Sequence, residues 1–207
     1  MQNLDRPDIN QAQNQMLHPG SRKLFRYWES LRAERACPRK DEINLRNIVD
    51  VVPNLSIIER KLSDNTWQFR LAGTKIYDLF GREMTNCDAL LSFDGFERGV
   101  VGNCLEITQK RLQPSLVRMR FISEQDIIVA AEMIGLPIQN GDNGQIQIFG
   151  GLFSFHNSRL GYTPALLRRE LVSARMIWTE HDAGDMLLGA VGRKAPTQFQ
   201  VIQGGIS

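Results

Sequence analysis

Alternating apolar and polar positions predict five β-strands, because side chains along a strand point to opposite faces in turn. The predicted strands lie at residues 54–60, 67–72, 114–122, 127–138 and 145–155. Ser63–Asn65 and Asn140–Gly144 are rich in turn-forming residues, so they predict tight connections between strands. Two strands joined so closely run antiparallel.

Apolar residues spaced three or four apart predict helices between these strands. The predicted helices span residues 21–35, about 41–52 (one or two turns), 74–80, 94–111 and 163–179. Gly81 follows the third where a left-handed cap needs glycine, and Gly150-Gly151 indicates a bulge or a close approach of two backbones. In the helix at 94–111 we expect a buried stripe formed by Phe96, Val100, Cys104, Leu105 and Ile107.

The order of these elements predicts an α+β fold, in which helices cover one face of a single antiparallel five-stranded sheet. Residues 21–155 form this domain with its N-terminal helix, and residues 1–20, rich in Gln and Asn, form a flexible arm before it. Residues 156–207 form a C-terminal helix and tail.

Composition narrows the class of protein. Of the 207 residues, 42% are hydrophobic, which is enough to form a buried core. The net charge of +2 is too small to indicate nucleic-acid binding. No apolar run reaches the about 18–20 residues of a membrane span, and the N-terminus is unlike a signal peptide. The three cysteines have no metal-binding spacing, so we expect free thiols in the cytoplasm and no metal site.

One pair of charges is singled out by the pattern. Glu132 is the only charged residue in the strand at 127–138, and Arg70 faces away from the apolar row of its own strand. A carboxylate inside a sheet needs a cation, so we expect Arg70 and Glu132 to form an ion pair or to hold a polar ligand. Neither has a nucleophile or a second carboxylate beside it, which argues against an enzyme.

Two segments resemble a known family. Residues 69–85, FRLAGTKIYDLFGREMT, and residues 27–44, YWESLRAERACPRKDEIN, resemble stand-alone bacterial PAS-like proteins, and the similarity covers about residues 21–155. This resemblance implies a cytoplasmic sensor or interaction module, often dimeric, whose sheet and helices can enclose a small ligand. The cofactor stays unknown, because the helix at 94–111 lacks the histidine of haem sensors and Asp88 follows Cys87 where flavin photosensors have arginine.

The function expected from this resemblance is non-catalytic regulation in signal transduction through contacts with another, unidentified signalling protein. The alternative is a receptor with a small molecule between sheet and helices, and a small enzyme is a third interpretation. The candidate ligand-binding residues are Phe69, Leu71, Ile76, Phe80, Val117, Met119, Phe121 and Phe153, with Arg70 and Glu132 as polar candidates.

The helix at 21–35 predicts how the protein assembles. Leu24, Tyr27, Trp28 and Leu31 form one apolar stripe, and aromatic residues are enriched at interface centres. We expect a homodimer built through this stripe. In the competing interpretation, the helix folds back over its own sheet.

Overall fold

The computed structural model describes residues 7–61, 63–91, 93–141, 144–155 and 166–177. The helices are α1 (Pro7–Asn14), α2 (Pro19–Arg32), α3 (Thr74–Phe80) and α4 (Gly95–Arg111), with the 3-10 helices η1 (Lys40–Glu42) and η2 (Leu45–Asn54). The strands are β1 (Leu55–Arg60), β2 (Trp67–Ala72), β3 (Ser115–Ser123), β4 (Ile128–Gln139), β5 (Ile146–Ser154) and β6 (Leu166–Met176).

The strands form one sheet in the order β2-β1-β5-β4-β3-β6, and every neighbouring pair is antiparallel. The predicted α+β fold is therefore confirmed, as are the five predicted strands and the antiparallel first pair. The sheet has a sixth strand, β6, which pairs with β3 along its whole length.

The helix predicted at residues 163–179 is wrong, because residues 166–176 form β6. Leu171 and Ala174 suggested a helix because they are three residues apart, yet both pack on the same face of the sheet. A bulge between the pairs Arg118↔Ser173 and Met119↔Leu171 adds a residue to β6 and brings the two side chains to one face. Trp178, the last residue of the predicted stripe, lies outside the described residues.

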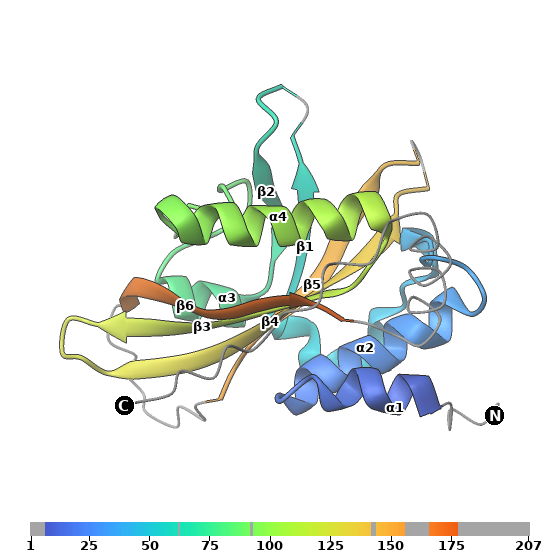
Figure 1. Cartoon of the computed structure of the whole chain (residues 1–207), viewed down its shortest axis with the longest axis horizontal. Coiled ribbons are helices and arrows are strands. Elements are labelled where there is room, and N and C mark those ends of the chain that lie inside the picture. The colour runs from blue at the N-terminus through green and yellow to red at the C-terminus, as the bar shows by residue number, and fades with distance from the viewer. Residues whose placement is uncertain (1–6, 62, 92, 142–143, 156–165, 178–207) are drawn as a thin grey trace, which may run out of the picture.

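Helices cover both faces of the sheet, not one. Figure 1 shows α4 on one side, and α1 and α2 on the other. We call the buried cluster under α3 and α4 the helical-face core. It contains Ile58, Trp67, Phe69, Ile76, Leu79, Met84, Leu90, Phe93, Val101, Leu105, Val117, Met119, Phe121, Val129, Ala131, Ile148 and Leu152.

The cluster on the other face is the N-terminal core, in which α1, α2 and η2 pack on β1, β3, β4 and β5. It contains Ala12, Met16, Leu24, Phe25, Tyr27, Trp28, Ile48, Val51, Leu55, Leu116, Ile134, Leu136, Ile138, Phe149, Phe153 and Ile177. The sheet is thus the middle layer of three.

The flexible arm expected at residues 1–20 is wrong for the part that the structure describes. Residues 7–14 form α1, and the side chains of Ala12 and Met16 are buried in the N-terminal core. Helix α2 begins at Pro19, with His18 as its N-cap, two residues before the expected start at Ser21. Residues 1–6 lie outside the described residues.

The apolar stripe of α2 lies against the chain's own sheet. Leu24 is fully buried, Trp28 is 2% exposed, and the Trp28 indole Nε1 donates a hydrogen bond to the Pro137 carbonyl at 2.7 Å. Tyr27 is buried and its hydroxyl accepts the Asn44 N–H at 2.7 Å, while Leu31 packs partly buried beside them. The dimer interface predicted through Leu24, Tyr27, Trp28 and Leu31 is therefore wrong, and the helix folds back.

Two glycine predictions are confirmed. Gly81 ends α3 with φ of 65°, the left-handed conformation expected there. A Cβ on Gly150 would lie 2.4 Å from the Ile134 carbonyl oxygen of the paired strand, so the backbones approach closely at this point.

The stripe predicted for α4 is only partly right. Its buried residues are Val101, Cys104, Leu105 and Thr108, whereas Phe96 is 85% exposed. Counted at 100° per residue, Phe96 lies about 130° around α4 from the middle of this buried stripe. It therefore points away from the sheet.

Candidate functional site

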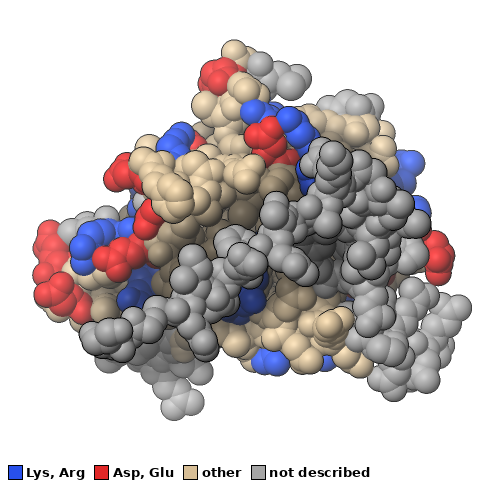
Figure 2. Space-filling model, in the orientation of Figure 1, with Lys and Arg blue, Asp and Glu red and all other residues tan. Residues whose placement is uncertain are grey.

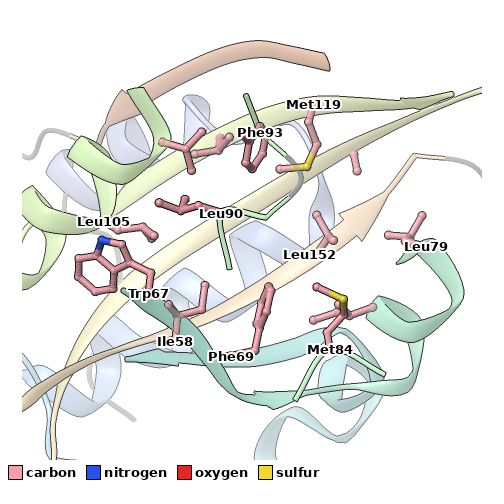
Figure 3. Close-up of a cluster of buried hydrophobic side chains, with 14 of the residues drawn as sticks. Ile58, Trp67, Phe69, Leu79, Met84, Leu90, Phe93, Leu105, Met119 and Leu152 are labelled. Carbon is pink, nitrogen blue, oxygen red and sulfur yellow. The ribbon is translucent and has the colours of Figure 1, made fainter. Parts of the chain in front are cut away.

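The first candidate site is the helical-face core, because the sequence placed its ligand-binding residues there. Phe69, Ile76, Val117, Met119 and Phe121 are all buried in it, each at most 3% exposed. Figure 3 shows such side chains converging from strands, from α3 and from the segment between α3 and α4. The structure thus brings five of the eight apolar candidates together, and their binding of a ligand stays a prediction.

Phe80 lies at the rim of this core and is only partly buried. Its ring meets those of Phe69 and Phe121 edge to face, with centroids 6.3 Å and 5.5 Å apart. One side of the ring thus continues the core, and the guanidinium carbon of Arg169 lies 4.2 Å from its centroid.

Leu71 does not belong with these residues, because it is 44% exposed. The cause is a bulge in β2: Ile58 pairs with Phe69 but Ile57 pairs with Leu71, which leaves Arg70 as an extra residue. After the bulge the alternation is reversed, so Ala72 packs on the helical-face core and Leu71 points away.

Phe153 lies on the wrong face for the predicted pocket. It is buried in the N-terminal core, while its neighbour Leu152 is in the helical-face core. There its ring stacks on the His18 imidazole, with centroids 5.1 Å apart. Phe153 therefore packs against the start of α2 and does not line a site under α4.

The second candidate site is the polar cluster around Glu132, which is fully buried. The predicted ion pair with Arg70 is wrong: β1 and β5 separate β2 from β4, and Arg70 is exposed. The partner is Arg118, directly opposite on β3, whose Nε donates to a Glu132 oxygen at 2.9 Å. The alternation of Leu116 and Arg118 in the sequence was the signal that could have identified it.

Glu132 also holds the chain before α2. Its two oxygens accept the backbone N–H groups of Leu17 at 3.0 Å and His18 at 2.9 Å. Burial raises the pKa of Glu132, but these hydrogen bonds and that from Arg118 outweigh burial and hold the pKa below its ordinary value. An ionised carboxylate therefore joins β4 to the start of α2.

His18 completes the polar cluster. Its Nδ1 accepts the Gly20 N–H at 3.0 Å, which caps the helix. Burial lowers the pKa of His18 and so favours the neutral imidazole, although the charge of Glu132 acts in the opposite direction. Sequence reasoning placed His18 in a flexible arm and so missed it.

Asp88 and Cys104 bear on whether the chain could hold a cofactor. Asp88, which follows Cys87, forms an ion pair with Arg98 at 2.6 Å. The buried Cys104 thiol has its pKa raised by desolvation. Within the described part of the chain, no three His, Cys, Asp or Glu side chains gather as metal ligands, and none of the helices there is long and apolar enough to span a membrane.

Comparison with known proteins shows the family. The sequence matches a family described as PAS domain over residues 16–153. A search of the curated proteins finds no match. Among solved structures, a light-oxygen-voltage domain studied with a flavin analogue is similar with a TM-score of 0.42 and 8% identity, covering 72% of this chain and 95% of that one.

Two further solved structures are similar at the same level. The light state of the blue-light photoreceptor Aureochrome1 LOV domain has a TM-score of 0.39 and 9% identity over 56% of this chain and 91% of that one. The RsLOV d2 variant has a TM-score of 0.39 and 13% identity, covering 55% of this chain and 67% of that one. The family assignment depends on the sequence match, which covers more than half of the chain. This chain belongs to the PAS domain family.

Proposed function

We propose that this protein is a non-catalytic regulator in signal transduction and that its output passes through contact with another protein. The family supports a sensory role in general terms. The contact with a partner is the specific part of the proposal.

The observation that carries it is the exposure of Phe96. This ring, in the first turn of α4, is 85% exposed, and Leu91, just before the helix, is 50% exposed. Fully burying such a side chain contributes about 1.5–3 kcal/mol. Two large apolar side chains, one in the first turn of α4 and one just before it, are therefore available for a protein partner to cover.

The filled helical-face core supports the same proposal. The side chains between the sheet and α3 and α4 belong to the chain itself, and they pack against one another (Figure 3). A domain with this interior acts more readily through its outer surface than through a large enclosed ligand.

The test compares a variant of this surface with a matched control. Phe96→Asp places a charge on the proposed contact, and Val49→Asp makes the same change at a 69% exposed residue of η2. Immobilised wild type and Val49→Asp should capture the same partner from extract, and Phe96→Asp should bind it at least about tenfold more weakly.

Equal capture by both variants would remove Phe96 from the contact. Turnover of a metabolite by the purified protein, with no partner recruited, would overturn the proposal as a whole. If light scattering gives a doubled mass that only Phe96→Asp reduces, the partner is a second copy of this chain.

A second candidate function is a small-molecule receptor. It is favoured by the hollow in the surface beneath α4, which Figure 2 shows on this face, and by the partly buried Phe80 at the rim of the core. Native mass spectrometry tests it: a reproducible added mass that heating releases supports a receptor, and the mass of the bare chain contradicts it.

A further inference from the structure

Arg169 of β6 lies where the helical-face core reaches the surface. It pairs with Phe121 across β3 and β6 and is therefore on the same face of the sheet. Its guanidinium carbon is 4.2 Å from the Phe80 ring centroid and 5.5 Å from that of Phe121. The charge is thus held against two aromatic rings, on the side of the sheet that α3 and α4 cover.

One nitrogen of this guanidinium, the buried Nε, lacks a hydrogen-bond partner. Among the described residues, no carboxylate forms an ion pair with Arg169 or with the nearby Arg82. Glu97 of α4 reaches β6, but it accepts the backbone N–H of Leu171 at 3.1 Å. The neighbouring Arg168 forms an exposed ion pair with Glu170 at a distance of 3.3 Å.

The charged group that affects the pKa of Arg169 is another cation, Arg82. Burial, and to a smaller extent the positive charge of Arg82, together lower the pKa of Arg169 to about 10. Like charges repel each other, and Arg169, which is partly buried, also loses hydration there. Placing two cations together in this way costs free energy, and a bound anion would offset that cost.

Arg60 provides a comparison within the same chain. Its Nε is also buried without a partner, and its guanidinium lies 5.3 Å from the Trp67 ring centroid. Arg60, however, lies close enough to Glu106 to lower the pKa of that carboxyl group. Arg60 thus has a carboxylate nearby, whereas the charged group of the described residues that affects the pKa of Arg169 is a second arginine.

The turn after α3 sets the position of Arg82. Phe80 ends the helix, Gly81 adopts φ of 65°, and the chain then turns so that Arg82 follows at once. Phe80 and Arg82 thus come from one short turn, and Phe121 and Arg169 from one strand pair. Two separate parts of the fold contribute one ring and one cation each.

We infer that Arg82 and Arg169 bind the doubly charged phosphate group of a small organic molecule whose apolar part lies against Phe80. Guanidinium groups suit phosphate because their N–H donors match its oxygens. A dianion compensates two cations, and the partly buried Phe80 ring offers an apolar surface beside it. The inference does not depend on the partner contact at Phe96, because it concerns the rim between α3 and β6.

Calorimetric titration of the full chain with phenyl phosphate tests this site. Phenol and inorganic phosphate serve as the two half-ligands, one with the ring and one with the charge. Wild type should bind phenyl phosphate saturably and more tightly than inorganic phosphate. Arg169→Gln should weaken binding by about tenfold or more, the effect of losing one charge-assisted contact.

The exposed Arg82 provides a variant that keeps the fold even if Arg169→Gln does not. Arg82→Gln should weaken binding of phenyl phosphate by a similar factor. Arg168→Gln, one residue away and paired with Glu170, is the matched control and should leave binding unchanged. No saturable binding by wild type, or equal binding by wild type and Arg82→Gln, would overturn the inference, as would phenol binding as tightly as phenyl phosphate.

Discussion

Glu132 and Arg118 face each other directly across β4 and β3, joined by a hydrogen bond of 2.9 Å from the arginine Nε to the carboxylate. The same carboxylate accepts the N–H groups of Leu17 and His18, which come immediately before α2. One buried anion therefore links two strands to the N-terminal helices.

Glu132→Ala should destabilise the protein by about 3–5 kcal/mol, because it leaves the charge of Arg118 and two backbone N–H groups unpaired inside the fold. Urea unfolding followed by circular dichroism measures this change. Glu106→Ala removes an exposed carboxylate that pairs with Lys110, and it should cost less than about 1 kcal/mol. Equal losses for both variants would show that the Glu132 cluster is not a structural anchor.

His18 should make stability depend on pH. Burial lowers its pKa, so folding favours the neutral imidazole, whose Nδ1 accepts the Gly20 N–H. The unfolded chain therefore binds the proton more readily. The stabilisation is present above the ordinary pKa of 6.5 and is lost as pH falls from there through the folded-state pKa.

The measurement is the free energy of unfolding at pH 8 and at pH 5.5. His18→Asn keeps a side-chain acceptor for the helix cap but does not titrate. Its loss of stability between the two pH values should be smaller than that of wild type. An unchanged pH dependence would exclude His18 as its source.

Trp28→Ala should cost about 3–5 kcal/mol of stability and leave the molecular mass in solution unchanged. The reason is that Trp28 is 2% exposed and packs against the sheet of its own chain. Trp28→Phe removes the bond to Pro137 but fills most of the space, so it should cost less. A variant that stays stable and becomes monomeric would restore the rejected dimer interface.

Gly150→Ala should prevent folding or destabilise severely, because the new Cβ would lie 2.4 Å from a backbone oxygen of β4 that cannot move independently. Gly99→Ala is the matched control in α4, where a Cβ meets nothing within 4 Å. There alanine should stabilise by about 0.5–1 kcal/mol, since glycine is the poorer helix former. Thermal unfolding of both variants checks the difference in sign.

Local pattern was sufficient for much of the fold. The strands β1 to β5 and the helix ending at Gly81 depend on alternation and on turn residues, which the sequence carries directly. The buried residues Phe69, Met119 and Phe121 followed from the same alternation. These features are properties of each segment by itself.

What the sequence could not supply depends on pairing between distant segments. The bulge opposite Ile57 and Ile58 turned Leu71 outward, and the bulge in β6 gave a strand the spacing of a helix. Glu132 was recognised as needing a cation, but only strand order and register select Arg118 over Arg70. Arg169 was not among the candidate site residues because its strand was interpreted as a helix.

The pairing of β6 with β3 also changes what the sheet presents to other molecules. Without β6, the apolar strand β3 would be an open edge, and its free N–H and C=O groups could template aggregation with strands of other chains. The edge is instead β6, whose charged residues are Arg168, Arg169, Glu170 and Arg175. A segment beyond the family match at residues 16–153 therefore covers the apolar strand β3 and makes a charged strand the edge of the sheet on that side.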